Sequence, residues 1–308
     1  MMKIVTFTIS PTIDVNTEVK HVLPERKLRC KSPHREPGGG GINVSRAIKK
    51  LGGESLAIYP AGGATGKLLH HLMDIEQITQ KVVPVDVAVR ENFIIKETVS
   101  HQQFRFGLPS SKMDKQEWEH CLAALRHISP TPEYIVASGS VPPGVPMDFY
   151  ARLASLGKKL GARVIVDTAG EPLCEALEEG VFMVKPNIAE LQDIAGQTIE
   201  SEEQIKAMAM KFIENRGSQV VVISIGAGGA LLVTSDLSEH FRSPTVPIRS
   251  KVGAGDSMTA GIVLHLSRGN SIAEATQFGV AAGAAAVMTP GTELCRKEDT
   301  ERLYKLVA

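Results

Sequence analysis

The sequence has no excess of charge of either sign. Its 34 lysine and arginine residues balance 34 aspartate and glutamate residues, so the formal net charge at pH 7 is zero. Binding to nucleic acid or to an anionic membrane surface through bulk electrostatics requires a basic surplus, which this chain lacks. We therefore expect no nucleic-acid partner and no membrane partner, and any anionic ligand must be bound by a local group of charges.

Cysteine is scarce, and long apolar runs are absent. The four cysteines are far apart and show no Cys-x-x-Cys spacing, which argues against a disulfide framework or a zinc site. No apolar run approaches the roughly 18 residues that a membrane-spanning helix needs. The first ten residues alternate like a β-strand and lack the pattern of a signal peptide. We expect a soluble, cytoplasmic protein with reduced, mostly buried cysteines.

Short apolar runs alternate with amphipathic stretches over most of the 308 residues. The apolar runs predict buried parallel strands at 56–59, 134–137, 163–167, 182–184 and 220–223. Helical patterns occur between these runs at 147–160, 171–179 and 202–215. This alternation is typical of a mostly parallel sheet with helices on both faces, so we predict an α/β fold with three layers, α/β/α.

Two segments, residues 13–36 and about 85–106, interrupt this alternation because neither has helical periodicity. Each is long enough for a pair of antiparallel strands, and together they would form a small β-sheet that stands off the body as a lid. Since a small sheet with an apolar outer face usually needs a partner, we predict a homodimer that associates through this lid.

Three small residues and one carboxylate, Gly253-Ala-Gly-Asp256, precede a long apolar run. The pattern predicts a helix N-terminus at which the N–H groups of Gly253, Ala254 and Gly255 are unpaired. Together with the positive end of the helix dipole, these groups would form an anion site that a phosphate can approach closely. Asp256 in the first turn is either a functional acid or a favourable dipole partner, and this motif alone favours the second interpretation.

A second glycine cluster, residues 38–41, precedes a helical pattern that ends at Gly52. The dinucleotide pattern G-x-G-x-x-G is not met, because Asn43 or Val44 stands where its last glycine belongs and no apolar strand precedes the cluster. Asn43 carries both a donor and an acceptor, which suits a sugar hydroxyl, and a helix-capping role explains it equally well.

Lys185-Pro-Asn187-Ile-Ala-Glu190 follows a predicted strand and opens a helix, which places Asn187 and Glu190 on one face. The pair either holds magnesium through water or forms a capping box, and the spacing alone favours the capping box. Lys185 beside them favours a phosphate ligand. The glycine-rich stretch 224–229 predicts either a tight turn or the border of a triphosphate site.

Arg90, Arg105 and Lys27 lie in the two segments that interrupt the alternation. Each alone is more often a solvated side chain. A neutral protein that binds a phosphorylated substrate nevertheless needs a local cluster of such cations, and these three are the candidates.

Taken together and in this order, the motifs 38–43, 185–190, 224–226 and 253–256 make the chain resemble the ribokinase-like, phosphofructokinase-B family of sugar kinases. The resemblance covers essentially the whole chain. Four motifs in register are specific, whereas each one alone is weak. The resemblance implies one ribokinase-like kinase domain over residues 1–308, which carries the lid and uses ATP and Mg²⁺.

The resemblance also implies a role for each candidate residue. Asp256 would be the general base on the acceptor hydroxyl, beside an anion hole formed by the amides of Gly253, Ala254 and Gly255. The sugar-phosphate ligands would be Asp14, Gly38, Gly39, Asn43, Arg90, Arg105, Lys27 and Ser140. The ATP contacts would be Lys185, Asn187, Ser224, Gly226, Gly229, Ile248, Val280 and Ala284. The metal ligands would be Glu190 for Mg²⁺ and the carbonyls of Ser250, Val252, Ala286 and Gly291 for K⁺.

The chain departs from the family pattern at Lys251, Thr289 and Glu293, where relatives commonly carry Thr or Ser, Asn and Arg, so K⁺ binding stays an open question. The expected reaction is phosphorylation of fructose 6-phosphate at its 1-hydroxyl to give fructose 1,6-bisphosphate. Tagatose-6-phosphate kinase and 1-phosphofructokinase are the alternatives, because these acceptors differ by one stereocentre or by the position of the phosphate. A non-catalytic sugar-phosphate sensor is the remaining alternative.

Overall fold

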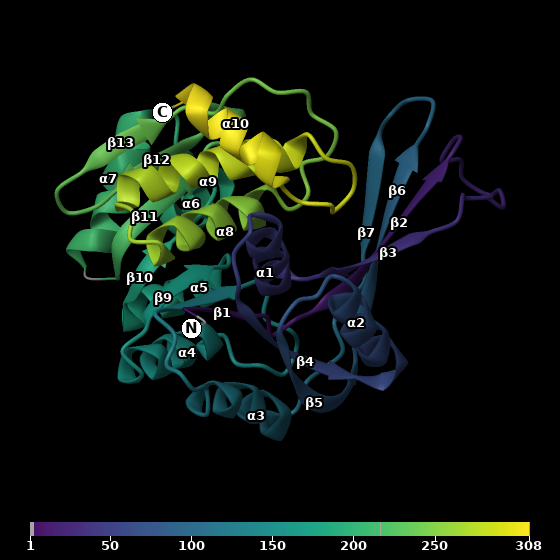
Figure 1. The fold of residues 1–308 in the computed structure, drawn as a ribbon, viewed down its shortest axis with the longest axis horizontal. Coiled ribbons are helices and arrows are strands. Elements are labelled where there is room, and N and C mark those ends of the chain that lie inside the picture. The colour runs from purple at the N-terminus through teal and green to yellow at the C-terminus, as the bar shows by residue number, and fades with distance from the viewer. Residues whose placement is uncertain (1–2, 216, 308) are drawn as a thin grey trace.

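The computed structural model describes residues 3–215 and 217–307 and shows two separate β-sheets (Figure 1). The larger sheet consists of β1 (Ile4–Phe7), β4 (Leu56–Gly62), β5 (Gln80–Ala88), β8 (Tyr134–Ser138), β9 (Arg163–Asp167), β10 (Val181–Val184), β11 (Ser218–Ser224), β12 (Ala230–Val233) and β13 (Ser238–Phe241). Within the described residues the strand order is β13-β12-β11-β10-β9-β8-β1-β4-β5. All pairs from β5 to β11 are parallel, and β12 and β13 add an antiparallel edge.

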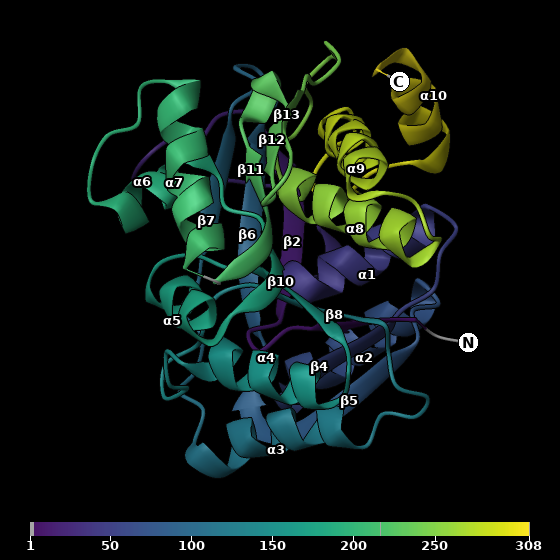
Figure 2. The same cartoon turned by 90° about the vertical axis from the view of Figure 1, so that its left-hand side faces the viewer.

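Helices cover both faces of the larger sheet, as predicted (Figure 2). On one face lie α1 (Gly40–Lys50), α2 (Gly63–Ile75), α8 (Ala254–Ser267), α9 (Ile272–Val287) and α10 (Lys297–Val307). On the other lie α3 (Lys115–Arg126), α4 (Phe149–Lys159), α5 (Glu171–Glu179), α6 (Ile188–Ala195) and α7 (Glu202–Glu214). Successive strand residues point to opposite faces: Tyr134 and Val136 belong to the first core, and Ile135 to the second.

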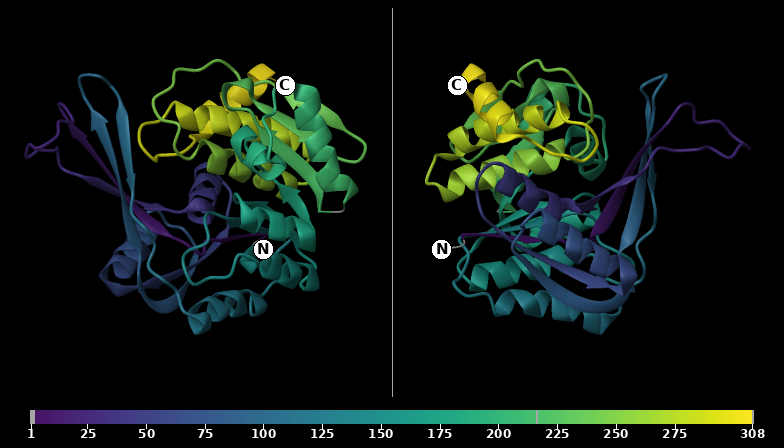
Figure 3. Two further views of the ribbon diagram at one scale, coloured as in Figure 1. Left: turned by 180° about the vertical axis from the view of Figure 1, so that it is seen from behind. Right: turned by 45° about the vertical axis from the view of Figure 1, so that its right-hand side comes forward.

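The smaller sheet consists of β2 (Thr12–Val19), β3 (His34–Gly38), β6 (Arg90–Glu97) and β7 (Gln103–Gly107), in the order β3-β2-β6-β7. Each of the two predicted segments forms an antiparallel pair, and the pairs join through the parallel strands β2 and β6. This sheet, the lid of the sequence analysis, extends away from the body (Figure 3). Its base is anchored by Ile13 and Val15, which belong to one apolar cluster with Leu69 and Met73 of α2.

The structure corrects one boundary of the predicted lid. The sequence predicts that the second lid segment begins at about residue 85, but residues 85–88 belong to β5 of the larger sheet. Only Val89 separates β5 from β6, which begins at Arg90. Because no glycine or turn residue marks the change of sheet, the extended run does not reveal where the body ends.

The four cysteines form no disulfide in the described residues: Cys121 and Cys295 are buried, Cys174 is half-buried and Cys30 is exposed. Among the helices of the described residues, none is long and apolar enough to cross a membrane.

The carboxyl ends of β8, β9, β10 and β11 meet along one edge of the larger sheet, where ligands of open parallel sheets commonly bind. The polar residues after these strands are therefore brought together.

Candidate active site

Helix α8 begins at the predicted glycine motif, with Gly253 as its N-cap. Gly253 has φ 74°, a left-handed conformation that favours glycine, and a Cβ there would lie 2.3 Å from Leu294 Cδ2. The N–H groups of the first turn, including those of Ala254 and Gly255, have no acceptor within their own helix. The predicted helix N-terminus is thus confirmed.

Asp256, in the first turn of α8, is surrounded by polar side chains from other elements. Asn43 of α1 donates a hydrogen bond from Nδ2 to Asp256 Oδ2 at 2.9 Å. Lys185, which follows β10, forms an ion pair with Asp167 at the end of β9, with 3.3 Å between Nζ and Oδ2. Thr259 Oγ1 donates to the same oxygen of Asp167 at 2.9 Å. The helix N-terminus therefore holds two acids and one lysine close together.

These surroundings raise the pKa of both Asp256 and Lys185. Burial, together with the neighbouring carboxylate of Asp167, raises the pKa of Asp256 to about 6, against the hydrogen bond from Asn43 and the charge of Lys185. Burial alone lowers the pKa of Lys185, but the charges of Asp167 and Asp256 raise it overall, so the ammonium stays protonated. A carboxylate with a pKa near 6 is well suited to accept a proton at neutral pH.

Asp256 lines two separate cavities. The first, here named the lid cavity, has a volume of about 270 Å³ and lies against the inner face of β2, β6 and β7; its walls include Asp14, Gly39, Asn43, Asn92, Arg105 and Gly253. The second, here named the strand-end cavity, has a volume of about 710 Å³. Its walls include Ser140, Asp167, Lys185, Asn187, Glu190, Ser224 and Gly255.

Asp14 presents a buried carboxylate to the lid cavity. It accepts hydrogen bonds from Asn92 Nδ2 and from Thr12 Oγ1, each at 3.2 Å, and burial raises its pKa. A Cβ at Gly38 would lie 2.6 Å from Asp14 Oδ2, so a side chain at this position would displace the Asp14 carboxylate. Asn92 was not predicted: it faces Asp14 only through the register of β2 with β6, which the sequence does not reveal.

The structure places the three predicted cations differently. Arg105 lines the lid cavity. Arg90 is near enough to Asp14 for their charges to interact, but its Nη1 donates to Leu108 O at 3.0 Å. Its Nε has no hydrogen-bond partner among the residues that the structure describes. Lys27 lies in the exposed loop between β2 and β3 and is not part of the lid-cavity wall.

Asn187 and Glu190 form the capping box that the spacing favours. Asn187 N donates to Glu190 Oε2 at 2.9 Å, and Glu190 N donates to Asn187 Oδ1 at 3.0 Å. The box uses only one oxygen of the Glu190 carboxylate, and burial raises the pKa of this group. Ser140, which the resemblance assigns to the sugar, lies in the strand-end cavity together with this pair.

The predicted adenine contacts differ in their exposure. Ile248 is 60% exposed in the loop after β13, whereas Val280 and Ala284 of α9 are buried. The run of small residues in α9 lets this helix approach α8 closely, since a Cβ at Gly279 would lie 2.5 Å from Ile262 Cγ1. Helix packing accounts for these small residues, and a contact of Ile248, Val280 and Ala284 with adenine stays a prediction.

The glycines after β11 form a tight turn. Gly226 opens a short 3₁₀ turn with φ 60°, and Gly229 closes it with φ 97°. Ser224, the last residue of β11, lines the strand-end cavity, and the turn follows directly. The turn interpretation of this stretch is confirmed, and a contact with ATP stays a prediction.

The carbonyl of Ala286, one of the four predicted K⁺ ligands, accepts hydrogen bonds from Thr289 N at 3.1 Å and from Thr289 Oγ1 at 2.8 Å. A K⁺ site formed by the carbonyls of Ser250, Val252, Ala286 and Gly291 stays a prediction.

Sequence reasoning missed Asp167, Thr259 and Arg46. Asp167 had a usable signal, because it is the polar last residue of a predicted parallel strand, the place where ligands of such sheets bind. Thr259 stands three residues after Asp256, which places both on one side of α8. Arg46 stands three residues after Asn43, which places both on one side of α1, but the spacing does not show that it is buried.

This fold and this site define the chain as a ribokinase-like sugar kinase. The profile described as "pfkB family carbohydrate kinase" matches residues 1–299, and the chain belongs to this family. It is 41% identical over 306 residues to "ATP-dependent 6-phosphofructokinase isozyme 2" of Mycobacterium tuberculosis, covering 99% of this chain and 90% of the relative.

Solved structures of phosphofructokinase-2 from Escherichia coli are similar over the full chain. The structure in complex with potassium gives a TM-score of 0.96 at 38% identity and covers 100% of this chain and 99% of that one. The structure in complex with fructose-6-phosphate gives 0.94 at 37% identity, with the same coverage of both chains. The predicted ribokinase-like fold is confirmed by this similarity.

Proposed function

We propose that the chain is an ATP-dependent 6-phosphofructokinase, which converts fructose 6-phosphate to fructose 1,6-bisphosphate. The observation that carries the proposal is the position of Asp256, which lines both the lid cavity and the strand-end cavity. A carboxylate between the two accepts the proton of a hydroxyl held on one side while the phosphoryl group arrives from the other. The similarity to 6-phosphofructokinases over the full chain supports the same assignment.

The residues around Asp256 then have distinct roles in the transfer. Asp256 takes the proton of the sugar 1-hydroxyl while the hydroxyl oxygen bonds to the γ-phosphorus and the bond from that phosphorus to the β–γ bridging oxygen breaks, which releases ADP. The N–H groups of Gly253, Ala254 and Gly255 and the dipole of α8 stabilise the charge on the transferring group. Lys185, a buried ammonium beside Asp256, offsets the negative charge of the ATP phosphates.

In the lid cavity, the sugar hydroxyls would be held by Asp14, Asn43 and the backbone of Gly38 and Gly39. Arg105 is the cation that faces them, so it would bind the 6-phosphate. The free Nε of Arg90 offers a second donor after a small movement of the side chain. Lys27 would have to approach from the exposed loop between β2 and β3.

On the nucleotide side, ATP would contact Lys185 and the predicted residues Asn187, Ser224, Gly226, Gly229, Ile248, Val280 and Ala284. The strand-end cavity fits a magnesium nucleotide, because Glu190 lines it together with Lys185 and one oxygen of the Glu190 carboxylate is outside the capping box. Bound Mg²⁺ would neutralise charge on the phosphates. A K⁺ ion at Ser250, Val252, Ala286 and Gly291 would be a further cofactor.

The lid would complete the site by covering the sugar and excluding water. Leu23, Val99 and Phe106 are large apolar side chains exposed on the lid. Exposed apolar groups of this kind mark surfaces that associate, so we propose a homodimer through the lid. We also propose a cytoplasmic location, in keeping with the family's chemistry.

The acceptor specificity tests this function. ADP release is followed with ATP and Mg²⁺ and, in turn, fructose 6-phosphate, fructose 1-phosphate, tagatose 6-phosphate and unphosphorylated fructose. We expect the highest kcat/KM with fructose 6-phosphate. Preference for another sugar phosphate would move the assignment to one of the alternatives, and release with none of them would support a sensor.

The activity is expected to fall below a pH of about 6. Asp256 acts as a base only when it is ionised, and its pKa is raised to about 6. A plot of log kcat/KM against pH should therefore show an acid limb with an apparent pKa near 6 and a plateau at neutral pH. An acid limb near 4, the usual value of a carboxyl group, would contradict this account of the site.

A further inference from the structure

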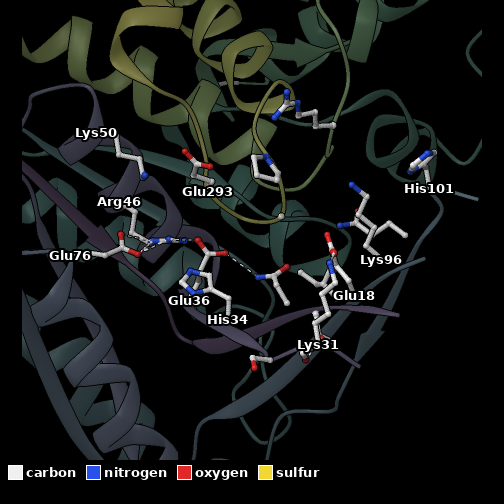
Figure 4. A pocket seen from close by; sticks show the side chains of 18 of the residues that line it. Glu18, Lys31, His34, Glu36, Arg46, Lys50, Glu76, Lys96, His101 and Glu293 are labelled. Atoms are coloured by element: carbon white, nitrogen blue, oxygen red, sulfur yellow. Dashed lines mark hydrogen bonds and ion pairs between the residues drawn. The ribbon is translucent and has the colours of Figure 1, made fainter. Parts of the chain in front are cut away.

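Arg46 of α1 is the bulkiest fully buried side chain in the described residues, with 1% of it exposed. Its guanidinium is surrounded by acceptors (Figure 4). Nε donates to Glu76 Oε2 at 2.8 Å, and Nη2 donates to Glu36 Oε1 at 3.1 Å. Nη1 donates to Pro37 O at 2.9 Å and to Thr292 O at 3.2 Å. One cation thus joins β3, α1, the end of α2 and the loop that precedes α10.

The Asn43 side chain lies between the same guanidinium and the carboxylate of Asp256. Arg46 Nη1 lies 3.5 Å from Asn43 Oδ1, and Asn43 Nδ2 donates to Asp256 Oδ2 at 2.9 Å. A guanidinium only donates and a carboxylate only accepts, so the amide between them satisfies both in one orientation. The flipped amide would place its NH₂ against the guanidinium and its oxygen against the carboxylate. The arrangement therefore fixes which atom of Asn43 faces Asp256.

We propose that Arg46 is a positioning residue for the catalytic base, acting through the orientation of the Asn43 amide. The inference rests on the proposed function, because it takes Asp256 as the base. Arg46 is not part of the wall of the lid cavity or of the strand-end cavity, and the separate cavity of about 720 Å³ that it lines with Glu36 and Glu76 does not include Asp256. In the proposed reaction it therefore acts on Asp256 through Asn43.

A second connection leads from Arg46 to the anion hole. Thr292, whose carbonyl accepts from Arg46, is two residues before Leu294, and the side chain of Leu294 lies against Gly253. The Thr292 hydroxyl also donates to Glu36, which is itself paired with Arg46. The guanidinium thereby holds the loop that limits the position of the α8 N-terminus.

Loss of the guanidinium should change the titration of Asp256. The other charged groups that face Asp256 are Asp167 at the end of β9, Lys185 after β10 and Asp14 of β2. With Asn43 free to turn, Asp256 would lose the hydrogen bond that lowers its pKa. Asp14 would lose the nearby positive charge of Arg46, which lowers its own pKa, so the pKa of Asp14 would rise. The loss of the hydrogen bond from Asn43 is therefore the change that acts on Asp256, and it should move the acid limb to higher pH.

The test compares Arg46→Met and Arg46→Lys with the wild-type protein. Because Arg46→Met leaves two carboxylates without their partner, the same change is also made together with Glu36→Gln and Glu76→Gln, which removes the unpaired charges. In the folded variants that lack the guanidinium we expect kcat to fall about 10- to 100-fold, as for a displaced base. The acid limb should rise by about 0.5–1 pH unit, and KM for fructose 6-phosphate should change less than kcat. Arg46→Lys keeps the charge and should recover part of kcat.

Glu76→Gln alone is the matched control. It weakens the network on the side away from Asn43 and leaves Arg46 in place. We expect a lower melting temperature with the wild-type kcat and acid limb. If the triple variant folds and keeps the wild-type kcat and acid limb, Arg46 has only a structural role and the inference is overturned. Equal loss of kcat in Glu76→Gln would overturn it as well.

A direct titration separates this inference from the proposed function. The pKa of the Asp256 carboxyl is measured by ¹³C NMR, with the signal assigned by its loss in Asp256→Asn. Failure of the wild-type protein to release ADP with every acceptor would refute the function, and the titration would still decide the inference. An upward shift on loss of Arg46 supports it, and an unchanged pKa overturns it. In an Asn43→Ala background we expect loss of Arg46 to shift the Asp256 titration less, because the part transmitted through Asn43 is already gone.

Discussion

Asp256→Asn is expected to lower kcat by about two to four orders of magnitude, the usual effect of removing a general base. Asparagine has nearly the same shape and still offers Asn43 Nδ2 an acceptor, so the hydrogen bond between α1 and α8 should survive. What it lacks is the ability to take the proton of the acceptor hydroxyl. Steady-state ADP release at pH 7 measures the effect, and unchanged turnover would refute the mechanism.

The same substitution is expected to stabilise the fold. The pKa of Asp256 is raised from 3.8 to about 6, so the folded protein binds the proton more tightly than the unfolded chain does. The resulting stability is fully present below pH 4 and is lost as pH rises through 6. At neutral pH, replacing the ionised group should raise the free energy of unfolding by about 1–3 kcal/mol. Denaturant unfolding measures this change in the free energy of unfolding. The control is Asp236→Asn on the surface, which should leave both activity and stability unchanged.

Gly253→Ala is expected to lower kcat by about two orders of magnitude, the scale of losing one donor of an anion hole. Two separate observations support this effect. Gly253 has φ 74°, which strains any residue with a side chain, and the added methyl would lie 2.3 Å from Leu294 Cδ2. Relief of that overlap must move Leu294 or the first turn of α8, and with it the N–H groups that face the phosphate.

Gly269→Ala is the matched control for this prediction. Gly269 also has positive φ, 87°, but an added Cβ would find no atom within 4 Å. The control therefore introduces the backbone strain without the overlap, and we expect it to lower the free energy of unfolding by about 1 kcal/mol and to leave kcat unchanged. If the two variants lose equal activity, the position of Gly253 at the anion hole is not what matters.

Local patterns in the sequence were sufficient to predict the body of the fold. The helix at 171–179 was predicted at its observed limits, and the start of α8 at Gly253 follows from three small residues before an apolar run. These elements depend on the periodicity of neighbouring residues, which a single sequence contains. No local pattern in the sequence shows that the chain passes from the body to the lid at Val89, between β5 and β6.

The parts of the site that depend on long-range contacts were not predicted. Asn92 meets Asp14 only after β2 has paired with β6, and the burial of Arg46 depends on acceptors 9, 10, 30 and 246 residues away in sequence. The three predicted cations were grouped because they share two segments, but each strand residue points to one face or the other. Only Arg105 lines the lid cavity.

The central claim is that Asp256 performs the chemistry and does not hold the sugar. Calorimetric titration of Asp256→Asn with fructose 6-phosphate, set beside its turnover, tests this claim most directly. We predict a dissociation constant close to that of the wild-type protein together with the loss of turnover. Loss of binding in step with turnover would contradict the claim, because it would make Asp256 a substrate ligand and leave the reaction without its base.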